Sequence, residues 1–488
     1  MLVRLHRGRR GATARRGRAA RRVPRGRRDE RRGNRRSGVP RERAPRARTA
    51  HVRVRERAGG RAGRQRRRGV SARSVVLTGR GIVSPLGVGA DVHWDALCAG
   101  RSAVGRLDRL AALGLPASRG AEVTADSIQP ELARLPRKQQ KLYNRATLLA
   151  MLGAALAMDD AGLGPGAGDP GRFGVLLGVN TLSWDFRAML EYLAASESRQ
   201  APGRLDMTLA NGYCMRSINP LDFSLKTLPN LVAGHVAIAH DAQGFCRAMT
   251  EGHVGGARAV GDAYRLIAEG DLDVALCGGA DDQLEELFFA THWGAGVMAS
   301  DDGRPGLVPG EGSGLLVLEA AERARARGAT AHGEIAGFAA SAGAGQLAGD
   351  EEPARLAERL ARVIDAVLEE SAETPDLVSL HGDSLPAHDA AEQAALAHVL
   401  GARAHATPRL RMKGAHADLG AASSPVELLA CSAAIEHATL PRAVAESPSS
   451  PPSTFRCALV ISLGLFGECA ALIVRTPHSR TADHGAAD

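Results

Sequence analysis

Strand-like and helix-like segments alternate along residues 74–476, and the alternation runs through twice. In the first run, strands are predicted at 74–78, 173–179, 274–277 and 314–318, and helices at 139–161, 183–196, 229–240 and 254–269. In the second run, strands are predicted at 333–339, 376–380, 408–412, 457–462 and 468–475, and helices at 354–370, 389–400 and 424–437. Two α/β halves of similar rhythm, 74–328 and 329–476, predict an internally duplicated, layered α/β fold.

The charge of the chain is concentrated at its beginning. Residues 1–70 hold 28 arginines and four acidic residues, a formal charge of +24, so a total of +10 leaves −14 on the rest. No apolar periodicity accompanies these arginines. We therefore expect residues 1–73 to be disordered, and we expect the same of the short tail at 477–488. Three origins are possible for the arginine-rich segment: a nucleic-acid arm, a transit-like leader, or translation of upstream DNA from a start placed too early.

The third origin is favoured, because the composition changes abruptly at Val70, which we expect to be the true initiator. Nucleic-acid binding is disfavoured because no aromatic residue is interleaved with the arginines. No stretch of 18 apolar residues occurs, which argues against a membrane span. The seven cysteines form no CxxC pair, a usage typical of a reducing cytoplasm, where we expect the protein to lie.

Six segments resemble β-ketoacyl-acyl-carrier-protein synthases in the family's order and at its spacing. They are 74–87 (SVVLTGRGIVSPLG), 219–244, 259–281, 303–329, 380–396 (LHGDSLPAHDAAEQAAL) and 461–474 (ISLGLFGECAALIV). The resemblance implies the thiolase fold, in which two duplicated halves pack as five αβαβα layers. It also implies a dimer formed through the strand before the nucleophile helix and the region around that helix.

The family's nucleophile is a cysteine in a T-A-C-x-S-G turn, where a helix N-terminus favours the thiolate. Here the turn reads TEGHVGG over Thr250–Gly256, and counting back without a gap from 259–263 places His253 at the cysteine position. Cys246, seven residues upstream in the preceding strand, is expected to be a buried and inert core residue. The sequence therefore predicts a site without its nucleophile.

The family's first histidine corresponds to His381, in LHGDSLP. The resemblance implies two threonines after it, whose hydroxyl groups hold the phosphopantetheine arm. Asp383 and Leu385 occupy these two positions, so a carboxylate and an apolar side chain replace two neutral donors. We expect a pantetheine arm to find poor partners here.

The second histidine of the family lies between a lysine and a glutamate. Lys413 and Glu427 keep the family's separation of 14, and this register puts Asp418 at the histidine position. A second register would use His416 but needs a two-residue gap, so Asp418 is preferred. The closing glycine-rich gate reads Gly464-Leu465-Phe466-Gly467, with Phe466 in place of a glycine. If that position needs a positive φ, phenylalanine strains the loop or gives it another shape.

Asp389 and Glu392 match the family's D-x-x-E, which implies structural support behind the histidine loop. His381, Asp383, His388 and Asp389 could suggest a metal cluster. One consecutive loop rarely converges four ligands, so neither a metal nor another cofactor is expected.

The chain thus lacks the family's cysteine, its two threonines and its second histidine. In this combination it resembles the chain-length factor, or ketosynthase β subunit, of type II polyketide and polyene synthases. This resemblance implies a heterodimer with an active ketosynthase and contact with acyl carrier protein through that partner. Phe223 and Leu225 are predicted to line the acyl tunnel. Two alternatives stay open: a self-sufficient acyltransferase or malonyl decarboxylase that uses His253 or His381, and a nucleic-acid binder. Whether the chain is itself an enzyme is therefore left open.

Overall fold

The computed structural model describes residues 73–180, 186–217, 225–343, 347, 352–446 and 452–478. The described part from Arg73 onward belongs to one compact unit. The expectations for residues 1–72, including Val70, for Phe223 and for 479–488 fall outside the described residues.

Both halves of the chain contribute strands to one mixed sheet. The N-terminal half gives, from the edge inward, β6 (Cys246–Met249), β5 (Phe173–Gly178), β7 (Val274–Asp282), β8 (Glu311–Ala320) and β1 (Val75–Ser84). The C-terminal half continues with β9 (Gly333–Ser341), β14 (Cys469–Arg475), β13 (Cys457–Leu463), β10 (Leu377–Ser379), β11 (Arg409–Leu410) and β12 (Ala445–Glu446). The two groups join where Val75–Leu77 pair with Gly333–Ile335.

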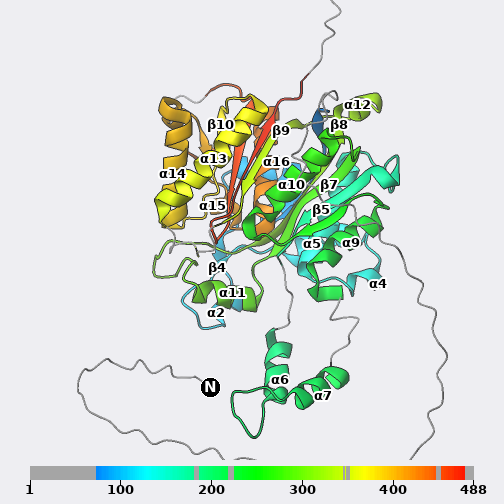
Figure 1. Cartoon of the computed structure of the whole chain (residues 1–488), viewed down its shortest axis with the longest axis vertical. Coiled ribbons are helices and arrows are strands. Elements are labelled where there is room, and N and C mark those ends of the chain that lie inside the picture. The colour runs from blue at the N-terminus through cyan, green and yellow to red at the C-terminus, as the bar shows by residue number, and fades with distance from the viewer. Residues whose placement is uncertain are drawn as a thin grey trace, which may run out of the picture. The chain divides into compact units, whose positions relative to one another are not determined.

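Helices lie on both outer faces and between the two groups of strands (Figure 1). The outer helices are α5 (Arg145–Asp160) and α9 (Pro229–Ala239) on the N-terminal half, and α13 (Pro353–Ser371) and α14 (Pro386–Leu400) on the C-terminal half. The central layer holds α10 (Gly255–Ala268) and α16 (Ser423–His437), which contact strands of both halves. The order of layers is α, β, α, β, α, so the predicted five-layered α/β thiolase fold is confirmed.

The remaining elements connect these layers. They are β2 (Gly87–Val88), β3 (Gly105–Arg106), β4 (Arg119–Gly120), α1 (Ala90–Cys98), α2 (Asp108–Ala111), α3 (Ala125–Leu132), α4 (Arg137–Gln140), α6 (Phe186–Ser196), α7 (Met207–Ser217), α11 (Glu286–Gly294), α12 (Ala321–Ala326) and α15 (Lys413–His416). The single helix predicted at 139–161 is wrong, because it divides into α4 and α5. Asn144 begins α5, where its side chain accepts a hydrogen bond from Thr147 N at 2.7 Å.

A close approach at the start of α10 sets the geometry of the centre. A Cβ added at Gly256 would lie 1.9 Å from the carbonyl oxygen of Ala421, in the turn before α16. Only a residue without a side chain permits this separation. The glycine therefore holds the N-terminus of α10 against the N-terminus of α16, and residues on both turns face one another.

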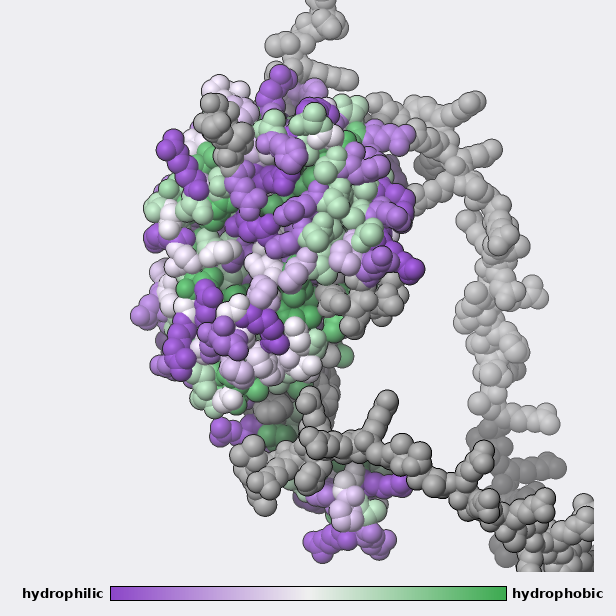
Figure 2. Space-filling view, turned by 90° about the vertical axis from the view of Figure 1, so that its left-hand side faces the viewer, coloured by the Kyte–Doolittle hydropathy of each residue, from purple (hydrophilic) through white to green (hydrophobic). Residues whose placement is uncertain are grey.

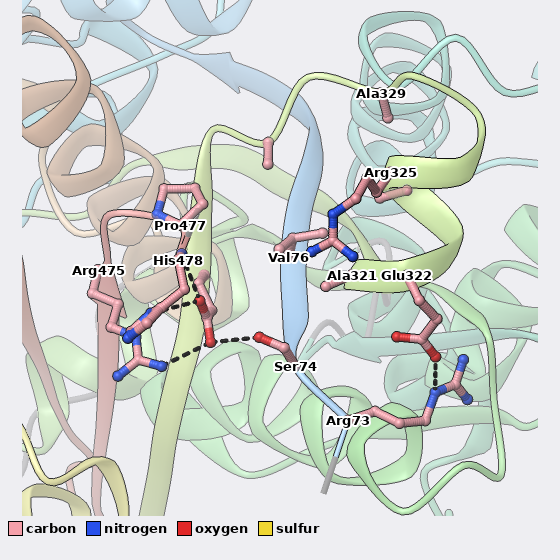
Figure 3. A pocket seen from close by; sticks show the side chains of 13 residues that line it. Arg73, Ser74, Val76, Ala321, Glu322, Arg325, Ala329, Arg475, Pro477 and His478 are labelled. Carbon is pink, nitrogen blue, oxygen red and sulfur yellow. Dashed lines mark hydrogen bonds and ion pairs between the residues drawn. The ribbon is translucent and has the colours of Figure 1, made fainter. Parts of the chain in front are cut away.

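The described chain begins and ends beside the same pocket, of about 590 Å³, which Figure 3 shows. Glu334 of β9 accepts hydrogen bonds there from Ser74 and from Arg475. The backbone N–H of His478 also donates to Glu334, at 3.1 Å. His478, at the start of the predicted tail, thus contacts the sheet.

On the side where α13 and α14 lie, hydrophilic and hydrophobic side chains are mixed over the surface (Figure 2). Among the helices that the structure describes, none combines the length and the apolar character needed to cross a bilayer.

Candidate active site

His253 lies in the short 3-10 turn Gly252–Val254, between β6 and α10. Its side chain is buried, and its Nε2 lies 3.1 Å from Oδ1 of Asp418. The Nε2 of Gln283 also donates to this Oδ1, at 3.0 Å. Burial lowers the pKa of His253, but the Asp418 carboxylate outweighs burial and raises it above the usual value. The residue predicted at the family's nucleophile position is therefore an imidazole paired with a carboxylate.

His381 follows β10, and both of its ring nitrogens have neighbours within the protein. Its Nε2 lies 3.2 Å from Oδ2 of Asp383, and its Nδ1 lies 3.4 Å from Nζ of Lys413. Burial, together with the positive charge of Lys413, lowers the pKa of His381 to about 4. The rings of His253 and His381 meet edge to face, with their centroids 5.8 Å apart. The structure thus brings the two predicted imidazoles together.

Lys413 forms the centre of the C-terminal part of the site. Its Nζ donates to Oε1 of Glu427 at 2.8 Å and to the carbonyl oxygen of His381 at 2.6 Å. Both side chains of this ion pair are buried. Burial alone lowers the pKa of Lys413, but the Glu427 carboxylate raises it, so the ammonium stays charged.

Asp389 and Glu392 lie on α14, outside the contact between the two imidazoles. Glu392 accepts hydrogen bonds from the backbone N–H groups of His381, at 2.7 Å, and Gly382, at 3.1 Å. Burial raises the pKa of Glu392 to about 7. Asp389 pairs with Arg411 at 2.7 Å. Glu392 therefore holds the loop that carries His381, while Asp389 connects α14 to Arg411, which directly follows β11.

Asp418, and not His416, faces His253. Burial raises the pKa of Asp418, but His253 lowers it more strongly, and the carboxyl group is ionised. Nδ1 of His416 donates to the carbonyl oxygen of Ala417 at 2.7 Å, and the ring lies 5.7 Å from that of His93. Only the ungapped register puts a side chain between the two halves of the site.

An apolar cluster of Val297, Leu385 and Leu465 lies beside these charged groups. Leu385 stands where the resemblance implies a threonine, and Leu465 belongs to the predicted gate Gly464–Gly467. Phe466 is half exposed and does not have a positive φ, whereas Gly467 has φ +81°. Phenylalanine is therefore accommodated without backbone strain at that residue.

Sequence reasoning missed Gln283, at the end of β7. No motif pointed to it, because its hydrogen bond to Asp418 joins residues 135 apart in the chain. The burial expected for Cys246 is wrong, since this cysteine is exposed on the edge strand β6. A separate cavity of about 330 Å³ reaches the site, and its lining includes Arg304, Asp383, Lys413 and Asp418.

The chain matches the Beta-ketoacyl synthase, N-terminal domain over residues 72–324. It matches the Beta-ketoacyl synthase, C-terminal domain over residues 332–445. The chain belongs to the β-ketoacyl synthase family. A curated family member, the tetracenomycin polyketide synthase ketoacyl synthase alpha subunit of Streptomyces glaucescens, is 32% identical over 75% of this chain and 86% of that protein.

Solved structures of this family give the same picture. The ishigamide ketosynthase/chain length factor aligns with a TM-score of 0.67 and 27% identity over 83% of this chain and 100% of that chain. A type II polyketide synthase acyl-carrier protein in complex with its ketosynthase bound to the hexaketide aligns with a TM-score of 0.67 and 25% identity, over the same shares. This β-ketoacyl synthase family member therefore resembles proteins of type II polyketide assemblies.

Proposed function

We propose that this chain is a chain-length-factor-type subunit of a type II polyketide synthase, which pairs with an active ketosynthase and performs no condensation itself. The observation that carries the proposal is the buried imidazole of His253, which we place at the nucleophile position and which lies 3.1 Å from the Asp418 carboxylate. Condensation needs a thiolate there to accept the acyl group from its thioester. An imidazole paired with a carboxylate supplies no thiol.

The cysteine nearest to this turn in the sequence does not replace the nucleophile. Cys246 is exposed on β6, and desolvation raises the pKa of its thiol above the usual value. A raised pKa leaves less thiolate at neutral pH, whereas catalytic cysteines need the opposite shift. This supports a role without covalent catalysis.

The groups that would hold a thioester are also engaged. Nε2 of His381 faces Asp383 at 3.2 Å, so it is not available to a carbonyl oxygen. Leu385 and Leu465 pack on Val297 where the family's arm-binding hydroxyl and gate would lie. These contacts disfavour the alternative in which His253 or His381 catalyses acyl transfer or decarboxylation.

The sheet offers an open edge for a partner. The carbonyl oxygens of Phe245 and Met249 accept hydrogen bonds from Val175 N of β5 and from Val179 N just after it, at 2.8 and 2.9 Å. In a parallel pair, the alternate residues of β6 then turn their N–H and C=O groups to the open edge. An exposed edge with free N–H and C=O groups is a template for another strand. This supports association through β6.

Apolar side chains are also exposed on the helices of the N-terminal half. Met207 is 64% and Met215 84% exposed on α7, and Ile238 is 82% exposed on α9. These side chains are available for contact with a partner. We infer a stable heterodimer that buries more than about 2,000 Å², as obligate pairs do, and that meets acyl carrier protein through the active subunit.

The test is co-expression with an intact Cys-His-His ketosynthase of a type II polyketide synthase, followed by purification and molar-mass measurement. Ala248→Pro blocks the open edge of β6 and should abolish the heterodimer. Ala445→Pro is the matched control, because Ala445 lies on β12 at the opposite edge of the sheet. Equal loss with both variants, or none with Ala248→Pro, contradicts association through β6.

The chain-length role has its own test. Enlarging Leu225, which stays a predicted tunnel residue, to tryptophan should shorten the product of the heterodimer while turnover continues. The measurement is the mass of the polyketide product. Products of unchanged length, or condensation by this subunit alone, contradict the proposed function. The nucleic-acid alternative concerns residues 1–72, which lie outside the described part of the chain.

A further inference from the structure

Three buried side chains of one segment converge behind His253. His381 follows β10, Asp383 lies two residues on, and His388 belongs to the first turn of α14. Their possible ligand atoms all lie within 4.8 Å of one another, and the three side chains are at most 2% exposed. We propose that His381, Asp383 and His388 bind one divalent metal ion of the zinc class. This proposal is independent of the chain-length role.

The donor set suits such an ion. Two imidazole nitrogens and one carboxylate oxygen favour Zn²⁺, Fe²⁺ or Co²⁺ over Mg²⁺ and Ca²⁺, which prefer oxygen ligands. Nε2 of His381 lies 3.2 Å from Oδ2 of Asp383, longer than the roughly 2.8 Å usual for a charge-assisted hydrogen bond. With bonds of about 2.0–2.1 Å, two tetrahedral ligand atoms are separated by about 3.3 Å. This separation fits two ligands of one ion, whereas Nδ1 of His388, 2.7 Å from the same Oδ2, has to move outward by about 0.6 Å to become the third ligand.

The three ligands are held in place by contacts that leave the binding atoms available. Oδ1 of Asp383 accepts a hydrogen bond from Leu385 N at 3.0 Å, so Oδ2 is the atom that faces the two histidines. Glu392 accepts from the backbone N–H of His381, which orients the loop. Supporting hydrogen bonds of this kind position metal ligands before the ion arrives.

The protons can be accounted for. A metal ion needs unprotonated ring nitrogens, so Nδ1 of His388, now 2.7 Å from Asp383, releases its proton to solvent. His381 moves its ring proton from Nε2 to Nδ1, which faces Nζ of Lys413 at 3.4 Å. One ammonium proton of Lys413 then passes along the 2.8 Å hydrogen bond to Oε1 of Glu427, and the neutral amine accepts the hydrogen bond from Nδ1 of His381. Each proton thus has an acceptor.

A cavity lies against the loop that carries Asp383. The cavity of about 330 Å³ is lined by Asp383 and its neighbours Gly382 and Ser384. It is large enough for the ion to enter with a water molecule, which would complete a four-coordinate site. The sequence argument expected no metal because four ligands on one loop rarely converge. In the structure Asp389 leaves the group and pairs with Arg411, and only three ligands remain.

The competing arrangement contains no ion: Asp383 simply accepts one hydrogen bond from each histidine. The two arrangements differ in metal content, so the full chain should be purified without a polyhistidine tag and analysed by plasma mass spectrometry. After removal of metal with a chelator, Zn²⁺ and Co²⁺ are titrated by calorimetry and by visible absorption. One equivalent of bound ion, a Co²⁺ band and a higher unfolding temperature with Zn²⁺ are expected.

Asp383→Asn and His388→Gln should each weaken Zn²⁺ binding by at least about 100-fold, since each removes one of three ligands. His398→Gln is the matched control, because His398 lies exposed on the same helix. Circular dichroism checks that each variant folds. The proposal is overturned if the wild-type chain binds no ion at millimolar Zn²⁺, or if both ligand variants bind as the control does.

Discussion

The two halves of the chain give the site two walls of different character. The N-terminal wall consists of His253 and Gln283, and the C-terminal wall of His381, Asp383, Lys413, Asp418 and Glu427. On the C-terminal wall, Lys413 pairs with Glu427 of the same half at 2.8 Å. His253, by contrast, has its ionic partner Asp418 on the opposite wall.

The difference shows which wall supports the centre. Lys413 and Glu427 compensate each other within the C-terminal wall, whereas Asp418 of that wall depends on His253 across the site. The two residues of the N-terminal wall, His253 and Gln283, both contact Asp418 of the C-terminal wall. Variants that alter one wall at a time can therefore test this comparison.

The largest effect is expected on the C-terminal wall. Lys413→Met leaves the buried Glu427 carboxylate without its cation and should cost roughly 3–5 kcal/mol of unfolding free energy. The double variant Lys413→Met/Glu427→Leu should recover much of this loss. Urea unfolding of the three proteins measures it. A cost near that of a surface ion pair would mean that this wall does not depend on its internal charges.

A smaller effect depends on pH and concerns Asp282, next to Gln283 of the N-terminal wall. Burial, with the nearby charge of Glu311, raises the pKa of Asp282 from 3.8 to about 6. The pKa of Asp282 is higher in the folded than in the unfolded protein. Its contribution to the free energy of unfolding is therefore fully present below the unfolded pKa and is lost as pH rises through the folded pKa of about 6. The loss is on the order of 2–3 kcal/mol.

Asp282→Asn keeps the acceptor for Leu284 N, at 2.9 Å, and should remove this part of the pH dependence. Urea unfolding at several pH values between about 4 and 7 measures the slope. Asp126→Asn, at an exposed position, serves as control and should keep the wild-type slope. If the Asp282→Asn variant also keeps the wild-type slope, another group is responsible for the titration.

The contact between the walls should be weaker than the C-terminal pair. Asp418→Asn keeps an acceptor for Gln283 but removes the charge opposite His253, and should cost about 1–2 kcal/mol. The matched control is Asp389→Asn, whose half-buried pair with Arg411 should contribute less than about 1 kcal/mol. If Asp418→Asn costs as much as Lys413→Met, the two walls are equally dependent on their charges.

The smallest expected effect is on activity. His253→Cys with Asp418→His restores two family residues and leaves no carboxylate without a partner. Condensation should still be undetectable by mass spectrometry, because Asp383 still faces Nε2 of His381 and Leu385 still packs on Leu465. Formation of a condensed product would show that the N-terminal wall alone prevents catalysis.

Much of the fold followed from local pattern. The buried strands β5, β7, β13 and β14 are short apolar runs, and their predicted positions differ from the observed ones by a few residues at most, apart from the longer C-terminal end of β7. The helix predicted at 139–161 failed at Asn144, because apolar spacing does not reveal a cap whose side chain accepts from Thr147 N. The prediction that Cys246 is buried was wrong, because an apolar sequence does not distinguish an edge strand from a central one.

The sequence by itself determined the layered α/β fold, and it predicted His253 at the nucleophile position and Asp418 at the position of the second histidine. Only the tertiary structure decided their partners: that Gln283 joins Asp418, that Asp383 faces both His381 and His388, and that Asp389 turns to Arg411. The physical reason is that hydrogen bonds and ion pairs act over about 3 Å. Segments more than a hundred residues apart reach that distance only after the two halves have packed around α10 and α16.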